Sequence, residues 1–301
     1  MQNLTVRLKE AAGDACVWEQ ESMKKHTTFR IGGPADLFAA PTTQEAVAEV
    51  IRICREQNYP FYILGNGSNL LVSDDGYRGL ILQLYRNFSE ILIEEDEIHV
   101  QSGAMLSVIA KRALEAGLTG FEFASGIPGT IGGAVVMNAG AYGGEMKDVL
   151  TEVTVLTKEN EIRTIPAAEL ELGYRTSAVM KNGWIVLGAK IKLQKGDPQA
   201  IRTRMEELKE QRVTKQPLEY PSAGSTFKRP EGYFAGKLIM DAGLRGFSVG
   251  DAQVSEKHCG FVVNKGNATA QDVLELIRQV TEKVKEQFGV TLEPEVKMLG
   301  M

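Results

Sequence analysis

Seven glycines fall between residues 126 and 144, a stretch of only 19 residues. Glycine inside a regular element costs roughly 0.5–1 kcal/mol relative to alanine, so a chain that packs only for stability has little use for this density. The run predicts backbone that a ligand approaches closely. The alternative is a glycine-rich turn region without a ligand. The sequence of this glycine-rich run is Ser125-Gly126-Ile127-Pro128-Gly129-Thr130-Ile131-Gly132-Gly133, followed further on by Asn138-Ala139-Gly140-Ala141-Tyr142-Gly143-Gly144.

A second glycine loop stands about sixty residues earlier, between two apolar runs. Its sequence is Leu64-Gly65-Asn66-Gly67-Ser68-Asn69-Leu70-Leu71-Val72, which predicts strand, tight turn and strand. The turn exposes backbone N–H groups that can hold a phosphate. No helix pattern follows it, and neither G-x-G-x-x-G nor the Walker pattern is present, which excludes the common dinucleotide and P-loop motifs. Alone, the loop is also typical of a hairpin without a ligand. Together, the two loops predict a long ligand such as a dinucleotide cofactor.

Composition narrows the class of protein. The chain has 301 residues, 43% of them apolar, and a net charge of −5, which is typical of a globular protein and argues against nucleic acid as the main partner. The longest apolar run, 131–137, is far shorter than the ~18–20 residues of a membrane span. Residues 1–22 contain no apolar segment of the secretory type. Three cysteines without a C-x-x-C pair predict neither a disulfide framework nor a metal site. We therefore expect a cytoplasmic protein.

The length and the alternation of helix and strand patterns predict two or three domains of mixed type. Thr42-x-x-Glu45 is a candidate capping box for the first helix, and residues 211–230 are expected to be irregular. The predicted helices cover residues 42–57, 106–114, 197–208, 234–242 and 269–288. The predicted strands cover 61–64, 70–72, 80–84, 91–93, 98–100, 153–156, 162–165, 184–193 and 260–263.

The two loops also carry a family resemblance. They are similar to the flavin-binding part of the UDP-N-acetylenolpyruvoylglucosamine reductase family, and four further motifs stand in the order that this family has. These motifs are Phe29-Arg30-Ile31-Gly32-Gly33, Gly173-Tyr174-Arg175-x-Ser177, Ala223-Gly224-Ser225-x-Phe227-Lys228-x-Pro230 and Leu292-Glu293-Pro294-Glu295-Val296. The resemblance covers nearly the whole chain.

The resemblance implies an α+β fold with three domains. Residues 1–85 and 86–196 would be the two subdomains of an FAD-binding fold of the vanillyl-alcohol-oxidase type. Residues 197–301 would be an α+β substrate-binding domain whose C-terminal segment returns to the active site. No inserted segment separates Gly144 from Lys215, which resembles the shorter type of the family that lacks a tyrosine-bearing lid loop. Which residue takes the place of that lid stays open.

The activity implied is the NADPH-dependent reduction of UDP-N-acetyl-enolpyruvoylglucosamine to UDP-N-acetylmuramate through FAD, in peptidoglycan precursor synthesis and so in cell-wall biogenesis, cell shape and cell division. NADPH would be the hydride donor. The expected FAD contacts are Ile31, Gly65, Asn66, Gly67, Ser68, Asn69, Ser125, Gly126, Ile127, Pro128, Gly129, Thr130, Gly132, Gly133, Asn138 and Gly140.

We expect FAD to be bound without a covalent bond. Relatives of this fold often tether FAD through a histidine in the phosphate loop, where this chain has Asn66 and Ser68. The three histidines, His26, His99 and His258, lie elsewhere in the sequence.

Three residues are the catalytic candidates. Charge develops on the substrate carboxylate as the hydride arrives, and the planar fork of an arginine suits a carboxylate. By resemblance that arginine is Arg175, Ser225 gives the proton, and Glu295 lies beside the enolate. The alternatives are a surface ion pair for Arg175, an ordinary loop hydroxyl for Ser225 and a solvated charge for Glu295.

Substrate recognition is assigned by resemblance to Tyr142, Lys215, Arg229 and, more weakly, His258. Some family members have glutamine at the position of His258, and a partly buried residue at a strand edge is the alternative there. The partner expected is a small molecule, a UDP-sugar enolpyruvyl ether, with no nucleic acid and no membrane, and we expect a monomer.

Two rival functions stay open on the sequence. One is another FAD oxidoreductase of this fold, such as a small-molecule oxidase, which would consume oxygen quickly once it is reduced. The other is a non-catalytic nucleotide-binding regulator, whose flavin band NADPH would not bleach.

Overall fold

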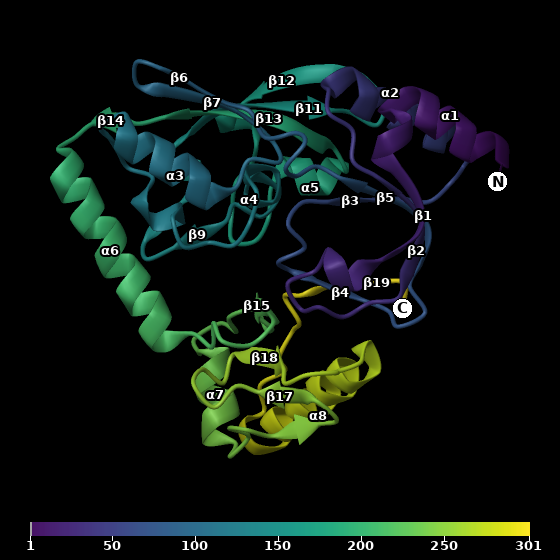
Figure 1. Ribbon diagram of the computed structural model, residues 1–301. Coiled ribbons are helices and arrows are strands. Elements are labelled where there is room, and N and C mark those ends of the chain that lie inside the picture. Colours follow the sequence, from purple (N-terminus) through teal and green to yellow (C-terminus); the bar gives the residue numbers. More distant parts are fainter. Residues whose placement is uncertain (1) are drawn as a thin grey trace. The chain divides into compact units, whose positions relative to one another are not determined.

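The computed structural model describes residues 2–301, and they form two compact units (Figure 1). Unit 1 contains residues 2–18, 37–66 and 79–212, and unit 2 contains residues 19–36, 67–78 and 213–301. The division of the chain at residues 85 and 196 stays a prediction.

Unit 1 is built on a five-stranded antiparallel sheet. The strands lie in the order β12 (Ile162–Pro166), β11 (Leu150–Leu156), β13 (Ile185–Lys192), β7 (Glu97–Gln101) and β6 (Ile91–Glu94). In register, Val153 faces Ala189 and Ile98 faces Ile191. Helices α3 (Leu106–Glu115) and α4 (Ile131–Met137) lie on one side of this sheet (Figure 1). Their apolar residues form one buried cluster with the inward-facing side chains of the strands.

A second apolar cluster of unit 1 lies under α1 (Gln2–Ala12) and α2 (Gln44–Glu56), which pack against each other. Ile185 and Leu187 of β13 join this cluster, whereas Val186 joins the other one, because neighbouring strand residues point to opposite faces. The smaller elements of this unit are β3 (Phe61–Leu64), β8 (Leu118–Thr119), β9 (Gly140–Ala141), β10 (Gly144–Glu145), β14 (Gln194–Lys195) and α5 (Ala178–Asn182), with short 3-10 turns η1 (Asp14–Cys16), η3 (Glu122–Ala124), η4 (Met146–Asp148) and η5 (Ala167–Glu169).

Two helix boundaries differ from the sequence prediction. The N-cap of α2 is Thr43 rather than Thr42, because the hydroxyl of Thr43 accepts a hydrogen bond from the N–H of Ala46 at 3.1 Å. Helix α6 (Pro198–Lys215) continues through residues that the sequence suggested were irregular. No glycine or proline interrupts the chain between Pro198 and Pro217, so nothing in that stretch ends the helix.

Unit 2 contains a four-stranded antiparallel sheet in the order β15 (Ser222–Ser225), β18 (Phe261–Asn264), β17 (Ala252–Val254) and β16 (Ser248–Val249). Helix α8 (Ala270–Phe288) packs on β16 and β17, and α7 (Ala235–Asp241) packs on α8. The predicted start and stop of α8 are confirmed, since Thr269 and Asp272 form a capping box and Gly289 ends the helix with a φ of 68°. The C-terminal strand β19 (Lys297–Leu299) pairs in parallel with β4 (Leu70–Val72), and η2 (Met23–Lys25) is a short turn.

A further sheet has the strand order β1 (Val17–Ser22), β2 (Pro34–Ala39), β5 (Tyr77–Gln83) and β3, and the boundary between the units falls within β1, β2 and β5. The predicted sequence of strand, glycine turn and strand around residues 65–69 is confirmed by β3 and β4.

Every helix among residues 2–301 is too short or too polar to cross a membrane.

Candidate cofactor and catalytic site

The two glycine loops meet in unit 1, although about sixty residues separate them in the sequence. The side-chain amide of Asn66 donates a hydrogen bond to the carbonyl of Pro128 at 2.7 Å. A Cβ atom added to Gly65 would lie 2.5 Å from the hydroxyl oxygen of Thr130. Glycine is therefore required at position 65 for the two loops to lie this close.

Where the loops meet, several backbone donors are unused. Within residues 2–301, the N–H groups of Asn66, Gly126 and Gly129 donate to no protein acceptor. All three residues are half-buried. Unpaired N–H groups on a glycine backbone are the donors that proteins use to hold phosphate, so this part of the chain fits the pyrophosphate of a dinucleotide.

Helix α4 begins directly after the second loop, and the sequence analysis did not predict it. Thr130 is its N-cap, and a Cβ atom on Gly132 would lie 2.9 Å from the Cβ atom of Ser102. The glycine thus lets the helix pack closely on the residue that follows β7. The high glycine content argues against a helix locally, but the packing of Ile131, Ala134 and Val135 in the core overrides it.

The last glycines of the run form a tight hairpin of β9 and β10. Ala141 pairs with Gly144, which leaves Tyr142 and Gly143 as the turn, with φ angles of 53° and 91°. Two consecutive positive φ angles define the turn type that suits the twist of a hairpin. A Cβ atom on Gly144 would lie 2.6 Å from the ring of Phe123. Turn geometry and packing thus account for Gly143 and Gly144, and Tyr142 lies exposed at the tip of the hairpin. The contact of Gly140 with FAD stays a prediction.

Arg175 lies on another tight turn of unit 1. Gly173 and Thr176 close the turn with backbone hydrogen bonds of 3.1 and 3.3 Å. Arg175 has a φ of 53°, and its guanidinium lies 5.2 Å from the centre of the Tyr174 ring. A non-glycine residue is rare in this conformation.

The side chain of Asn138, a predicted FAD contact, is bonded to the protein. Its amide nitrogen donates to the Glu145 carboxylate at 2.7 Å and to the carbonyl of Gly173 at 3.2 Å, and its oxygen accepts from the N–H of Lys147 at 3.0 Å. Only 2% of Asn138 is exposed. Its contact with FAD stays a prediction.

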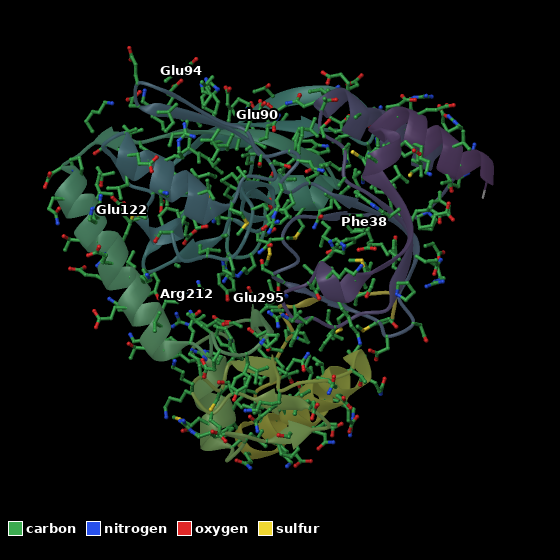
Figure 2. All side chains as sticks on the ribbon, in the orientation of Figure 1. Phe38, Glu90, Glu94, Glu122, Arg212 and Glu295 are labelled. Carbon is green, nitrogen blue, oxygen red and sulfur yellow. The ribbon has the colours of Figure 1, made fainter. Side chains whose placement is uncertain are left out.

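Arg212, which the sequence analysis did not single out, contacts the second loop. It lies on α6, and its guanidinium donates a hydrogen bond to the carbonyl of Gly126. A Cβ atom on Gly126 would lie 3.2 Å from the Cδ atom of Arg212. Figure 2 shows this side chain near the C-terminal end of α6. A predicted helix that continued past residue 211 would have placed Arg212 on α6, but the predicted helix ends at residue 208.

In unit 2, Thr28 connects Gly67 of the first loop to β15, the strand that carries Ser225. Gly67 has a φ of 64°, and a Cβ atom there would lie 2.0 Å from the carbonyl oxygen of His26. Thr28 donates its N–H to the carbonyl of Gly67 at 3.1 Å and its hydroxyl to the carbonyl of Ser222 at 2.6 Å. Ser68 and Asn69 are half-buried, and Ile31 is fully buried.

His26 lies closer to the first loop than its place in the sequence suggests. Its backbone contacts Gly67, but its Nε2 atom lies 2.9 Å from a carboxylate oxygen of Glu21. The imidazole is therefore already engaged by an acid. Non-covalent binding of FAD stays our prediction.

The structure brings Ser225, Glu295 and Asn69 to one region of unit 2. Ser225 pairs with Phe261 across β15 and β18. The N–H of Glu295 bonds to the carbonyl of Thr226 at 2.8 Å, and the amide of Asn69 donates to the carbonyl of Glu295 at 3.3 Å. The C-terminal segment thus lies between the first glycine loop and β15 within this unit, and Figure 2 labels Glu295 there. Ser225 is exposed and Glu295 half-buried.

The remaining substrate candidates of unit 2 lie on different segments of the chain. The ring of His258 packs edge-on against Phe261 at 5.0 Å, and its Nδ1 atom accepts the N–H of Gly260 at 3.1 Å. Burial lowers the pKa of His258 below its ordinary value of 6.5. The guanidinium of Arg229 lies 4.0 Å from the centre of the Phe234 ring. Lys215 is exposed at the end of α6.

Comparison with known proteins gives the class first. Residues 35–165 match a family described as an FAD binding domain. Phl p 4.0202, described as a glucose dehydrogenase, has the same fold over 65% of this chain and 44% of its own, with a TM-score of 0.51 at 12% identity. The family match and the paired loops therefore define an FAD-binding protein, which confirms the expected cofactor FAD and the multi-domain FAD-binding fold.

Residues 216–299 match the C-terminal domain of UDP-N-acetylenolpyruvoylglucosamine reductase. The reductase of that name from Agathobacter rectalis is 58% identical over 294 residues, which cover 94% of this chain and 93% of the relative. The one from Caldanaerobacter subterraneus is 52% identical, covering 99% and 98%. The crystal structure of the Thermus caldophilus enzyme has a TM-score of 0.80 at 38% identity, covering 93% of this chain and 97% of that one. The chain belongs to the UDP-N-acetylenolpyruvoylglucosamine reductase family, as its motifs predict.

Proposed function

We propose that this protein reduces UDP-N-acetyl-enolpyruvoylglucosamine to UDP-N-acetylmuramate, with NADPH as the hydride donor, and so serves peptidoglycan precursor synthesis. Membership of the family supports the reaction. The observation that carries the FAD-dependent part is the meeting of the two glycine loops. There Asn66 bonds to Pro128, and the N–H groups of Gly126 and Gly129 have no acceptor within residues 2–301.

The chain's own contribution to cofactor binding is a set of neutral backbone donors. Such donors hold the two negative charges of a pyrophosphate without a counter-charge that would have to be desolvated. When bound, FAD supplies the hydride that passes to the enol-ether double bond of the substrate. Binding of the substrate carboxylate and delivery of the proton fall to protein side chains.

Arg175 is proposed to bind the substrate carboxylate. Its guanidinium offers two parallel N–H donors in the geometry of a carboxylate, and its charge stabilises the negative charge that develops there. The turn from Gly173 to Thr176 sets the direction of this side chain before the substrate arrives.

Ser225 is proposed to give the proton that completes the reduction. A serine hydroxyl is a weak acid, so it can act only where it is held in place at the accepting carbon. The pairing of Ser225 with Phe261 and the small neighbours Ala223 and Gly224 support a fixed and accessible hydroxyl. Glu295 is proposed to act beside the same enolate, since its backbone bonds to Thr226, the residue after Ser225.

Recognition of the UDP-sugar is proposed for Tyr142, Lys215, Arg229 and His258. Lys215 and Arg229 supply positive charge for the diphosphate, and Tyr142 supplies a phenolic donor from an exposed hairpin tip. We also propose that the protein acts as a monomer with a small-molecule substrate and no nucleic acid.

Product analysis tests this function. The protein is incubated with NADPH and the enolpyruvyl sugar nucleotide, and the nucleotide is examined by mass spectrometry. We expect a product heavier than the substrate by one hydride and one proton. An unchanged nucleotide would contradict the proposal. Rapid consumption of oxygen with NADPH alone would favour the small-molecule oxidase instead.

A further inference from the structure

We propose that Asn138 is a positioning residue for Arg175, because its buried amide holds the turn from which Arg175 projects. The inference rests on the proposed role of Arg175 in binding the substrate carboxylate. It assigns Asn138 a different task from the FAD contact that the sequence suggested.

The first support is the way Asn138 is built into the fold. It ends α4 in the left-handed conformation, with a φ of 44°, and only 2% of it is exposed. Its side chain makes three hydrogen bonds. The amide nitrogen donates to the carbonyl of Gly173, in the turn of Arg175, and to the carboxylate of Glu145, and the oxygen accepts from the N–H of Lys147. A buried amide with such a full set of partners restricts every segment that it joins.

The second support is the strain at Arg175. A left-handed conformation is unfavourable for an L-residue, and this position of a tight turn ordinarily favours glycine. Arg175 nevertheless has a φ of 53°. The carbonyl of Gly173, at the base of the turn, accepts hydrogen bonds from both Thr176 and Asn138. The amide thus helps to hold the turn in this conformation.

The third support is the charge next to Arg175. The pKa of Glu145 is lowered by a hydrogen bond from Lys147, by the amide of Asn138 and by the charges of Lys147 and Arg175. Glu145 therefore stays ionised, and its charge interacts with that of the Arg175 guanidinium. Because Asn138 and Lys147 both bond to this carboxylate, it stays oriented beside the turn that carries Arg175.

The substitution Asn138→Asp removes the interaction with the least change in shape. The aspartate keeps an oxygen for the N–H of Lys147, loses both donors and places a second carboxylate beside Glu145. A shift of about 1 Å in a catalytic group can lower a rate about 100-fold. We expect reoxidation of the reduced enzyme by the enolpyruvyl substrate to slow about 100-fold, and reduction of the flavin by NADPH to stay within about twofold of wild type.

Equilibrium binding supplies a readout that does not depend on turnover. UDP-N-acetylmuramate carries the carboxylate, whereas UDP does not. If Asn138 positions Arg175, calorimetry should show weaker binding of UDP-N-acetylmuramate to Asn138→Asp and unchanged binding of UDP. The dissociation constant of FAD should also be unchanged.

Asn138→Gly is the second variant, because glycine accepts the left-handed conformation while all three side-chain bonds are lost. Asn58→Gly is its matched control. Asn58 also follows a helix, α2, with a φ of 48°, and it is exposed. We expect the Asn138→Gly variant to reproduce the selective loss and the Asn58→Gly variant to behave as wild type.

Five outcomes would overturn the inference. Equal slowing of both half-reactions, or loss of the fold in both variants, would show a general structural role. A tenfold weaker binding of FAD would show that Asn138 serves the cofactor. If the wild type reduces the substrate and Asn138→Asp behaves as the wild type does, the inference is overturned and the proposed function is not. Failure of the wild type to reduce the substrate would overturn the proposed function first, and the inference with it.

Discussion

Replacing Gly65 with alanine tests whether the approach of the two glycine loops is needed for FAD. Gly65 does not have a positive φ, so the backbone accepts alanine, and the only obstacle is space. The new Cβ atom would lie 2.5 Å from the hydroxyl oxygen of Thr130, whereas ordinary contact begins at 3.4 Å. Thr130 is 3% exposed and has little room to withdraw. The loops must therefore separate by about 0.9 Å at this contact.

The size of the effect of Gly65→Ala on FAD binding follows from two costs. Overfilling a packed site costs about 1–3 kcal/mol. The separation also strains the hydrogen bond of 2.7 Å from Asn66 to Pro128, which lies next to the clash. The free protein can relax by letting the loops part, but FAD needs them together. The cost should therefore appear in the dissociation constant of FAD, as a weakening of about 5- to 150-fold.

Fluorescence titration of the flavin-free protein with FAD measures this constant. The double variant Gly65→Ala/Thr130→Ala is the control, because it removes the clashing oxygen. We expect it to bind FAD more tightly than Gly65→Ala alone, although Thr130→Ala by itself removes the cap of α4 and costs about 1 kcal/mol. Wild-type affinity of Gly65→Ala for FAD would refute the reasoning.

Four other predictions can be checked with the same protein. Ser225→Ala should slow reduction of the enolpyruvyl substrate by roughly 10²–10⁴-fold and leave reduction of the flavin by NADPH intact, and equal losses in stopped-flow traces would contradict its role. Arg212→Ala should weaken FAD binding roughly tenfold by removing the hydrogen bond to the second loop, whereas Arg204→Ala, on the exposed face of the same helix, should not. Because burial lowers the pKa of His258 in the folded state, the unfolded chain takes up its proton first. The wild-type protein should thus lose stability as the pH falls from 6.5. Over the same pH range, the melting temperature of His258→Gln should fall less than that of the wild type. Acid precipitation should leave the flavin in the supernatant, and flavin in the pellet would indicate a covalent bond.

The sequence predicted most regular elements because their signals are local. Apolar periodicity that stops at Gly289 predicted α8, and four acidic residues, 94–97, separate the two predicted strands that pair as β6 and β7. Local signals also caused the errors. Two consecutive threonines both matched the cap of α2, and the polar surface of α6 after residue 211 concealed the continuation of that helix.

The glycine run shows what a sequence cannot separate. Gly65 and Gly126 lie where the two loops and Arg212 meet, as a ligand-binding role predicts. Gly143 and Gly144 instead serve a hairpin turn and its packing on Phe123. Both tasks demand glycine, so composition alone does not distinguish them. The site contributions of Arg212 and of the Asn138 amide depend on contacts between distant segments, which no local pattern reports.

Anaerobic spectroscopy of the purified wild-type enzyme tests the central claim most directly. NADPH is added first, and then the enolpyruvyl sugar nucleotide, while the flavin absorbance is followed. We predict that the yellow band bleaches with NADPH and returns in proportion to the substrate added. A protein that binds no FAD, or a flavin band that stays bleached after the substrate is added, would contradict the account.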